Sequence, residues 1–236
     1  MSAVLTEAEE IVAILEDKKA GERIKWLYET YGDRVVASTS FGLQAAVMLK
    51  LISENAPKIP IIFVDTGYLF KETYDYIAQL TEELDVDIRH YVPKLTSAWQ
   101  EARWPKLWET NPQEYGKINK VEPMNRALQE IGGDIWLSGL RRSQSSTRAE
   151  RPLAEQQGKT LKVYPILDWA DAQVFSFFCN QKLPKHPLEK QGYVTMGDWH
   201  STRKPEEGED AESTRYGGQK YECGLHESSG ENDFQI

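Results

Sequence analysis

Cysteine is almost absent from this chain of 236 residues, which contains only Cys179 and Cys223 and no C-x-x-C pair. Two cysteines cannot form the disulfide framework of a small secreted domain. Without a C-x-x-C pair, neither a zinc site nor a two-cysteine redox motif is expected. No cluster of histidine, cysteine and carboxylate residues occurs at ligand spacing, so the sequence predicts no metal.

Long apolar runs and an excess of positive charge are missing as well. No segment approaches the roughly 18 consecutive apolar residues of a membrane span, and the acidic, amphipathic N-terminus does not resemble a signal peptide. The net charge of -9 argues against general binding of nucleic acid. We therefore expect a cytoplasmic protein that binds neither membranes nor nucleic acid, in which an anionic ligand would need a local basic pocket.

Strands and helices alternate regularly over residues 34–93. The pattern predicts a β-branched strand at 34–39, a helix that ends before Pro57, an apolar strand at 59–66, a helix at 69–84 and a strand at 87–93. The middle strand is apolar throughout, as expected when both of its faces are covered. This order predicts a parallel sheet with right-handed crossovers.

The remaining chain is less regular. A helical segment at 6–31 is interrupted at Gly21, and a Trp-rich stretch at 99–120 is expected to be irregular. Next come a helix at 121–131, a strand at 134–140, a basic loop at 141–151, a strand at 162–167 and a helix at 169–182. We predict a doubly wound, mostly parallel α/β sheet with an N-terminal helix in a domain of residues 1–206, followed by a mobile tail of residues 207–236.

Three stretches follow predicted strands, where ligands bind in open parallel sheets. The first, "STSFGLQ" at 38–44, contains Ser38, Ser40 and Gly42. Small residues at a helix start let backbone N–H groups approach a phosphate, although a plain helix cap would use the same residues. In the second stretch, "VDTGYLF", Asp65 and Thr66 could bind a ribose or an adenine, or Asp65 could cap the next helix.

The third stretch, "SGLRRSQSSTR" at 138–148, is basic in an acidic chain. It contains Gly139 and three arginines, Arg141, Arg142 and Arg148. Guanidinium groups suit multiply charged phosphates, whereas a solvated basic loop is the alternative. Earlier in the chain, Lys120 and Arg126 flank another helix start, which by itself is a weak signal.

The two cysteines have different surroundings. Cys179 lies on an apolar helix face and is expected to be buried and inert. Cys223 lies in a polar segment between Lys220 and His226, where positive charge would lower the pKa of its thiol. A single accessible thiolate suits a nucleophile that forms one covalent bond and needs an external thiol for its release. An accidental tail cysteine is the alternative.

Taken in order, seven stretches resemble the assimilatory 3′-phosphoadenylylsulfate (PAPS) reductase family. They are "STSFGLQAAVML", "VDTGYLFKET", "SAWQEARWPKLWE", "NKVEPMNRAL", "GLRRSQSSTR", "HPLEKQGYVTMGDWHSTR" and "KYECGLH". The resemblance implies an adenine-nucleotide α-hydrolase-like fold. It also implies reduction of PAPS to sulfite and adenosine 3′,5′-bisphosphate by thioredoxin or glutaredoxin, an external dithiol, in a homodimer.

The resemblance also assigns roles to individual residues. It makes Cys223 the nucleophile, which would carry a cysteine S-sulfonate until the dithiol releases sulfite. Lys120 and Arg215 would lie at the sulfate and phosphate groups, and His226 beside the cysteine could meet the substrate. The modified phosphate loop would comprise Ser38, Ser40, Gly42 and Gln44, and the basic loop would include Arg141 and Arg142.

Two departures from related patterns separate the subclasses. The loop Ser40–Ala45 lacks the aspartate and final serine of the ATP-cleaving relatives. Reductases of adenylylsulfate (APS) usually hold a [4Fe–4S] cluster on four cysteines, and Tyr115–Gly116 and Asp198–Ser201 stand where those pairs would lie. We therefore expect no iron–sulfur cluster. A cluster-free APS reductase and a non-catalytic nucleotide-binding module remain alternatives.

Overall fold

The computed structural model describes residues 6–209 and 211–214, and a six-stranded sheet lies at its centre. The strand order is β3-β2-β1-β4-β6-β5. The strands are β1 (Val35–Thr39), β2 (Pro60–Val64), β3 (Asp87–Tyr91), β4 (Ile135–Leu137), β5 (Ala154–Gln157) and β6 (Thr160–Val163). All neighbouring strands are parallel except β5 and β6, which confirms the predicted mostly parallel α/β sheet.

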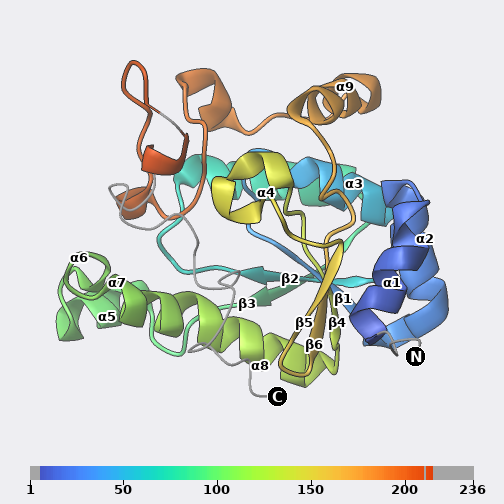
Figure 1. Ribbon diagram of the computed structural model, residues 1–236. Helices are drawn as coiled ribbons and strands as arrows, with labels where there is room; N and C mark the ends of the chain where they lie inside the picture. The colour runs from blue at the N-terminus through green and yellow to red at the C-terminus, as the bar shows by residue number, and fades with distance from the viewer. Residues whose placement is uncertain (1–5, 210, 215–236) are drawn as a thin grey trace.

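Helices cover both faces of this sheet (Figure 1). On one face, Val35 and Ala37 of β1 share a core with α2 (Ala20–Tyr31), α3 (Ala45–Asn55), α4 (Lys71–Glu83) and α9 (Asp171–Gln181). On the other face, Val36 packs with α8 (Glu122–Ile131). Because successive strand residues point to opposite faces, one apolar strand supplies both cores, as the doubly wound arrangement requires.

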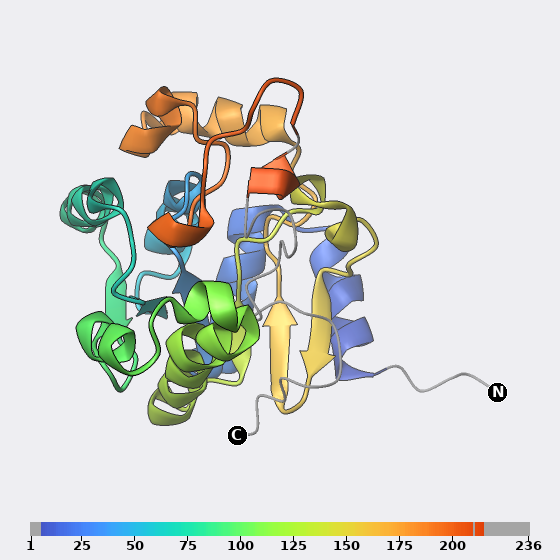
Figure 2. The same ribbon diagram turned by 90° about the vertical axis from the view of Figure 1, so that its left-hand side faces the viewer.

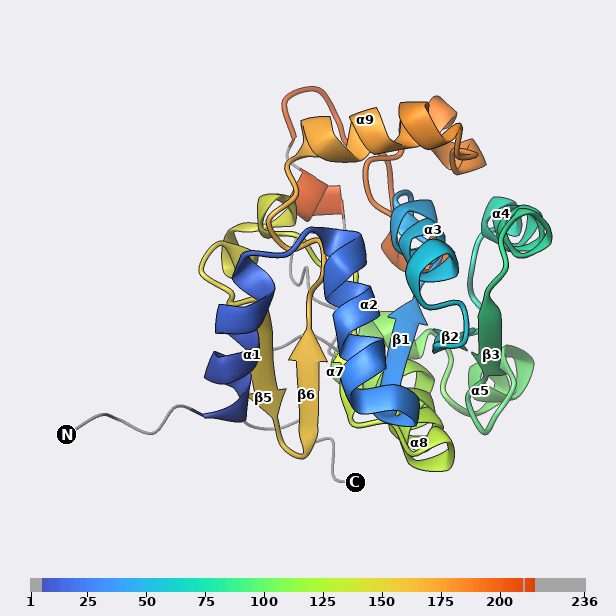
Figure 3. The same cartoon turned by 90° about the vertical axis from the view of Figure 1, so that its right-hand side faces the viewer.

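The N-terminal segment forms two helices, α1 (Glu7–Glu16) and α2, which lie beside the strands β5, β6 and β1 (Figure 3). The break lies at residues 17–19 and not at Gly21, which is in the first turn of α2. A Cβ atom on Gly21 would come within 2.8 Å of the Asn55 side chain. The glycine therefore allows α2 to pack closely against the end of α3. In the sequence, a glycine at this position looks like a helix break.

The stretch at 99–120 is helical and not irregular as predicted. It forms α5 (Ser97–Arg103), α6 (Leu107–Thr110), α7 (Pro112–Gly116) and a π-helical turn (Lys117–Val121). The side chains of Thr96 and Asn111 cap α5 and α7 by accepting hydrogen bonds from backbone N–H groups. Each of these helices is too short to show a clear helical period of apolar residues, so the sequence pattern does not reveal them.

Strand β5 is also absent from the sequence prediction. Its residues, "AEQQ", are mostly polar, and they pair antiparallel with β6 at the edge of the sheet. An edge strand has one unpaired side and needs no continuous apolar character.

Beyond α9, 3₁₀ turns replace regular elements, at Pro187–Gln191, Trp199–Ser201 and Ala211–Thr214. Three more occur earlier, at Gly32–Arg34, Arg142–Gln144 and Ser146–Arg148. Figure 2 shows the segment after α9 at the end of the sheet toward which β6 points. An isolated bridge between Leu69 and Asp198, and a hydrogen bond of 2.9 Å from Trp199 N to Tyr68 O, join it to the loop after β2.

Helix α9 lies at the surface, and Cys179 on it is exposed. The expectation of a buried Cys179 is therefore wrong. Val174 and Phe178 are the buried residues of this helix, and a position adjacent to Phe178 is turned about 100° away from it. Among the residues described, no helix is both long and apolar enough to cross a membrane.

Candidate active site

A cavity of about 500 Å³ opens at the carboxyl ends of β1 and β4. The chain runs from β1 to β2 and β3 on one side, and β4 and β6 lie on the other, so this is the switch point where such sheets bind ligands. Most of the residues predicted from the sequence line it: Ser38, Ser40, Gly42, Gln44, Thr66, Lys120, Gly139, Arg141 and Arg148.

The loop between β1 and α3 has an unusual backbone. Phe41 adopts a positive φ of 48°, its N–H donates to Thr39 Oγ1 over 3.1 Å, and its buried ring packs edge-on against Phe63. Such a φ is uncommon outside glycine. Burial of the ring therefore holds the loop in a conformation that brings Ser40 and Gly42 to the cavity.

Helix α3 begins at this loop without a side-chain cap within the described part of the chain. Its N-cap residue is Gln44, whose Oε1 instead accepts a hydrogen bond of 2.6 Å from Arg141 Nη2. The plain-cap interpretation of Ser38 and Ser40 is therefore not supported. Ser38 Oγ accepts a bond of 2.8 Å from Trp136 Nε1. The N-terminus of α3, with its positive potential, faces the cavity wall.

Arg141 is the most buried cation of the basic loop, at 1% exposure. It donates to Ser143 Oγ (2.8 Å) and to the Trp169 carbonyl (3.1 Å), and it forms an ion pair of 2.8 Å with the exposed Asp171. Its Nε–H finds no acceptor among the residues described. A buried guanidinium with an unpaired donor at a cavity wall is suited to an anion.

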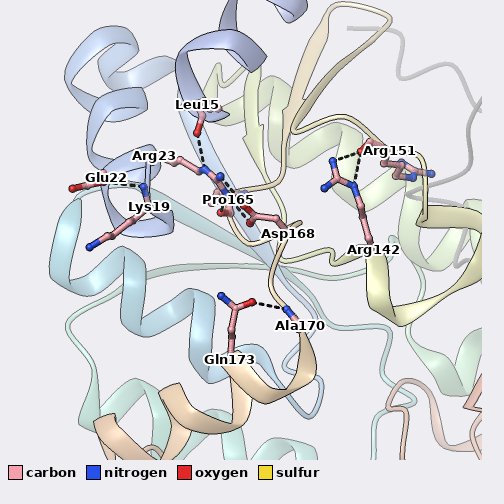
Figure 4. A network of polar contacts seen from close by, with 10 residues as sticks. All are labelled: Leu15, Lys19, Glu22, Arg23, Arg142, Arg151, Pro165, Asp168, Ala170 and Gln173. Atoms are coloured by element: carbon pink, nitrogen blue, oxygen red, sulfur yellow. Dashed lines mark hydrogen bonds and ion pairs between the residues drawn. The ribbon is translucent and has the colours of Figure 1, made fainter. Parts of the chain in front are cut away.

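The other two arginines of the loop differ in position. Arg148 is buried at the cavity wall and donates to Gln144 Oε1 over 2.6 Å. Arg142 is absent from the residues that line the cavity, and its guanidinium donates to the Arg151 carbonyl over 3.0 and 2.8 Å (Figure 4). Gly139 admits α3 closely, because a Cβ there would lie 2.9 Å from Met48 Cγ.

Asp65 is likewise not among the residues that line the cavity. Its Oδ1 accepts hydrogen bonds of 2.8 Å from Gly67 N and from Tyr74 Oη, and Oδ2 lies 3.5 Å from His90 Nε2. Asp65 does not cap the next helix, because the N-cap residue of α4 is Phe70 and no side chain of the described residues caps it. The Asp65 carboxylate instead closes the turn at Gly67. Its neighbour Thr66 reaches the cavity instead.

A buried ion pair lies at the cavity wall, formed by Lys120 of the π-helical turn and Asp198. Lys120 Nζ lies 2.7 Å from Asp198 Oδ2, and Thr66 Oγ1 donates to Asp198 Oδ1 over 2.5 Å. Burial raises the pKa of the Asp198 carboxyl, but the charge of Lys120 and the hydrogen bonds from Lys120 and Thr66 outweigh it and hold the pKa below its usual value. Sequence analysis assigned Asp198 no role at the site, because nothing in the sequence shows that this aspartate lies beside Lys120.

An aromatic group packs next to this ion pair. The His200 ring stacks on Trp108, with 4.3 Å between centroids and 11° between planes. Tyr68 and Tyr115 meet the His200 ring edge-on at 5.2 and 4.9 Å. His200 is thus enclosed by rings of the 104–116 stretch and the β2–α4 loop.

The remaining predicted residues, Cys223, Arg215 and His226, lie outside the residues that the structure describes. Among residues 6–209 and 211–214, no group of three or more histidine, cysteine or carboxylate side chains is arranged to hold a metal ion. His186 is buried between Thr73 Oγ1 (3.1 Å) and the Leu188 N–H (3.2 Å), so its ring has a structural role.

Three comparisons with known proteins agree with this geometry. The family model described as "Phosphoadenosine phosphosulfate reductase domain" matches residues 34–204. The phosphoadenosine 5′-phosphosulfate reductase of Photobacterium profundum is 47% identical over 95% of this chain and 90% of its own length. The enzyme of the same name from Salmonella choleraesuis is 48% identical, over 92% of this chain and 91% of its own.

Solved structures show the same likeness. A phosphate complex of phosphoadenylyl-sulfate reductase from Candida auris matches with a TM-score of 0.75 and 29% identity, over 86% of this chain and all of that one. The FMN adenylyltransferase of Candida glabrata matches with a TM-score of 0.59 at 14% identity, over 88% of this chain and 73% of that one. At that identity the likeness concerns the fold alone.

Proposed function

The chain belongs to the phosphoadenosine phosphosulfate reductase family, and we propose that it reduces PAPS to sulfite and adenosine 3′,5′-bisphosphate in sulfate assimilation. It is an oxidoreductase that acts on a sulfur group. The observation that carries the proposal for this chain is the buried Arg141 at the wall of a cavity beside the N-terminus of α3, since its Nε–H has no acceptor among residues 6–209 and 211–214. That combination suits a nucleotide with several anionic groups.

Within the cavity, we assign substrate binding to residues on three walls. The loop residues Ser40 and Gly42 and the start of α3 would receive one phosphate. Arg141 and Arg148 would receive another, and Lys120 the sulfate-bearing end. Arg215 and His226 are proposed to join them from the C-terminal segment, which lies outside the described residues.

In the first chemical step, the thiolate of Cys223 attacks the sulfur of the sulfuryl group. An S–S bond forms, and the S–O bond to the 5′-phosphate breaks with its electron pair on the nucleotide, which leaves as adenosine 3′,5′-bisphosphate. Cys223 then carries an S-sulfonate. Nearby cations such as Lys120 would neutralise the charge that develops on the leaving phosphate.

In the second step, a thiolate of an external dithiol, thioredoxin or glutaredoxin, attacks Cys223 Sγ. Sulfite leaves with the electron pair of the S–S bond, and a mixed disulfide remains. The second thiol of the dithiol attacks it, which restores the Cys223 thiol and leaves the partner as a disulfide. The dithiol supplies both electrons, so this chain needs no redox cofactor of its own.

The absence of an iron–sulfur cluster belongs to the same proposal. The segments at 115–116 and 198–201, where cysteine pairs would lie, contribute the rings of Tyr115 and His200, which contact each other. These side chains offer no thiolate ligand. We also propose a cytoplasmic homodimer, with the catalytic segment at 207–236 attached to a nucleotide-binding domain of residues 1–206.

Mass spectrometry of the protein incubated with PAPS in the absence of dithiol tests the mechanism. We expect an added mass of one SO₃ group on Cys223 and its loss when thioredoxin is added. The exposed Cys179 provides the matched control. Cys179→Ser should keep the adduct and sulfite release, and Cys223→Ser should abolish both. An unmodified Cys223 after nucleotide release would disprove the covalent step.

A further inference from the structure

Burial of the Asp198 carboxylate costs desolvation free energy, because it is only 1% exposed and lies at the cavity wall. Both oxygens are used, Oδ1 by Thr66 and Oδ2 by Lys120. A buried ion pair contributes little net stability, because desolvation of two charges offsets their attraction. The pair at this site therefore suggests a task other than stabilising the fold.

The task concerns Lys120, whose side chain is 10% exposed and also lines the cavity. A lysine at such depth tends to lose its proton, because burial disfavours the charged form. Its four-carbon stem is flexible, and fixing it costs rotamer entropy. A carboxylate at 2.7 Å counters both tendencies, since it favours the ammonium form and fixes where the nitrogen lies.

The backbone fixes this carboxylate in turn. Asp198 pairs with Leu69 in an isolated bridge, and its neighbour Trp199 donates to the Tyr68 carbonyl. The segment after α9 and the loop after β2 are therefore tied together at this point, and Lys120 comes from a third element. The arrangement brings a carboxylate to Lys120 from a segment that lies far along the chain.

We propose that Asp198 is a positioning residue for Lys120, holding its ammonium group charged and in place to receive the anionic end of the substrate. This inference rests on the proposed function, in which Lys120 contacts that end. Other titratable groups surround the pair. His200, Tyr68 and Tyr74 interact electrostatically with Asp198, and the Tyr115 ring lies 5.9 Å from Lys120 Nζ.

The pH profile of kcat/KM for Asp198→Asn tests the proposal. The amide keeps the shape and removes the charge, so Lys120 should lose its proton at lower pH. We expect the alkaline limb to move down by about one pH unit or more, which gives a loss relative to wild type that reaches roughly tenfold at pH values above both limbs. Profiles that superimpose between about pH 6.5 and 9.5 would overturn the proposal.

Two matched variants separate charge from structure. Thr66→Val removes the hydrogen bond to Asp198 and keeps the ion pair. The alkaline limb of its pH profile should therefore stay at the wild-type pH, even if the value of kcat/KM itself changes. Asp75→Asn makes the same chemical change in the exposed pair with Lys71 and should match wild type. A limb that shifts equally in Thr66→Val and Asp198→Asn would show that a structural contact, and not the charge, matters.

A double-variant cycle shows whether Asp198 acts through Lys120. Adding Asp198→Asn to Lys120→Met should cause no further loss of kcat/KM, because the charge to be positioned has gone. If the loss of kcat/KM in the double variant equals the product of the losses in the two single variants, the proposal is overturned. Calorimetric Kd values for adenosine 3′,5′-bisphosphate over the same pH range report on Lys120 without turnover, through the 5′-phosphate whose charge Lys120 would neutralise. A shifted binding profile therefore supports the role of Asp198 even if sulfite release fails, and an unshifted one rejects it.

Discussion

The guanidinium of Arg23 on α2 forms a two-pronged ion pair with the carboxylate of Asp168, with both hydrogen bonds at 2.8 Å (Figure 4). The same buried side chain also donates to the carbonyls of Leu15 (2.9 Å) and Pro165 (2.8 Å). Arg23 thus joins α1, α2 and the loop after β6. That loop continues to Asp171, the ion-pair partner of Arg141.

Replacing Arg23 by methionine should destabilise the fold. The two carbonyls and Asp168 would lose their donor, so we expect the free energy of unfolding to fall by about 2 kcal/mol. Urea denaturation followed by circular dichroism measures it. Arg34→Met breaks a pair with Asp134 in which Arg34 is 51% exposed, and it should cost less than about 1 kcal/mol. Equal losses in both variants would contradict this role for Arg23.

Acid should weaken the contribution of Asp168. The Arg23 hydrogen bonds and charge outweigh partial burial and hold the pKa of this carboxyl below its usual value. Because the pKa is lowered in the folded state, the ion pair contributes its full stability at pH values above the unfolded pKa of about 3.9. That stability is lost as the pH falls through the folded-state pKa. The urea midpoints of wild type and Asp168→Asn should therefore converge between about pH 5 and pH 2. The exposed Asp85→Asn is the control, and its urea midpoint should follow that of wild type at every pH. A difference between wild type and Asp168→Asn that stays constant as the pH falls would argue against this linkage.

Arg141→Gln should weaken substrate binding. Loss of one charge-assisted contact predicts a decrease in kcat/KM for PAPS of about one to two orders of magnitude, mainly through KM. Steady-state kinetics with a coupled thioredoxin assay measure it, together with the Tm of each variant. Arg89→Gln changes an arginine that is 57% exposed and paired with Asp87, and it should leave the kinetics unchanged. Wild-type KM in a folded Arg141→Gln would remove this residue from the site.

The 3′-phosphate should decide between PAPS and APS. A buried guanidinium that awaits this phosphate stays unpaired with APS, so we expect a preference for PAPS of about 10²-fold or more in kcat/KM. We would measure kcat/KM for both nucleotides in wild type, Arg141→Gln and Arg148→Gln. The arginine whose replacement abolishes the preference for PAPS is the one that binds the 3′-phosphate. Equal kcat/KM values in wild type would favour the cluster-free APS reductase instead.

Sequence reasoning located the cavity well, because it depended on rules that tertiary contacts do not alter. Ligands in open parallel sheets bind at the carboxyl ends of the strands, so the position of "STSFGLQ" and "SGLRR" after predicted strands is enough to assign both to the site. Arg142 and Asp65 show the limit of this reasoning. Adjacent residues on a loop point in different directions, and only packing decides which side chain faces the cavity.

Taken alone, the sequence determined the doubly wound sheet and the family, because strand and helix periods and ordered motifs are local properties of the chain. The tertiary structure decided which charges meet. Asp198 is separated from Thr66 by 132 residues and lies far along the chain from Lys120, yet all three share one buried contact. No local pattern encodes that contact, because it exists only after the segment beyond α9 returns to the loop after β2.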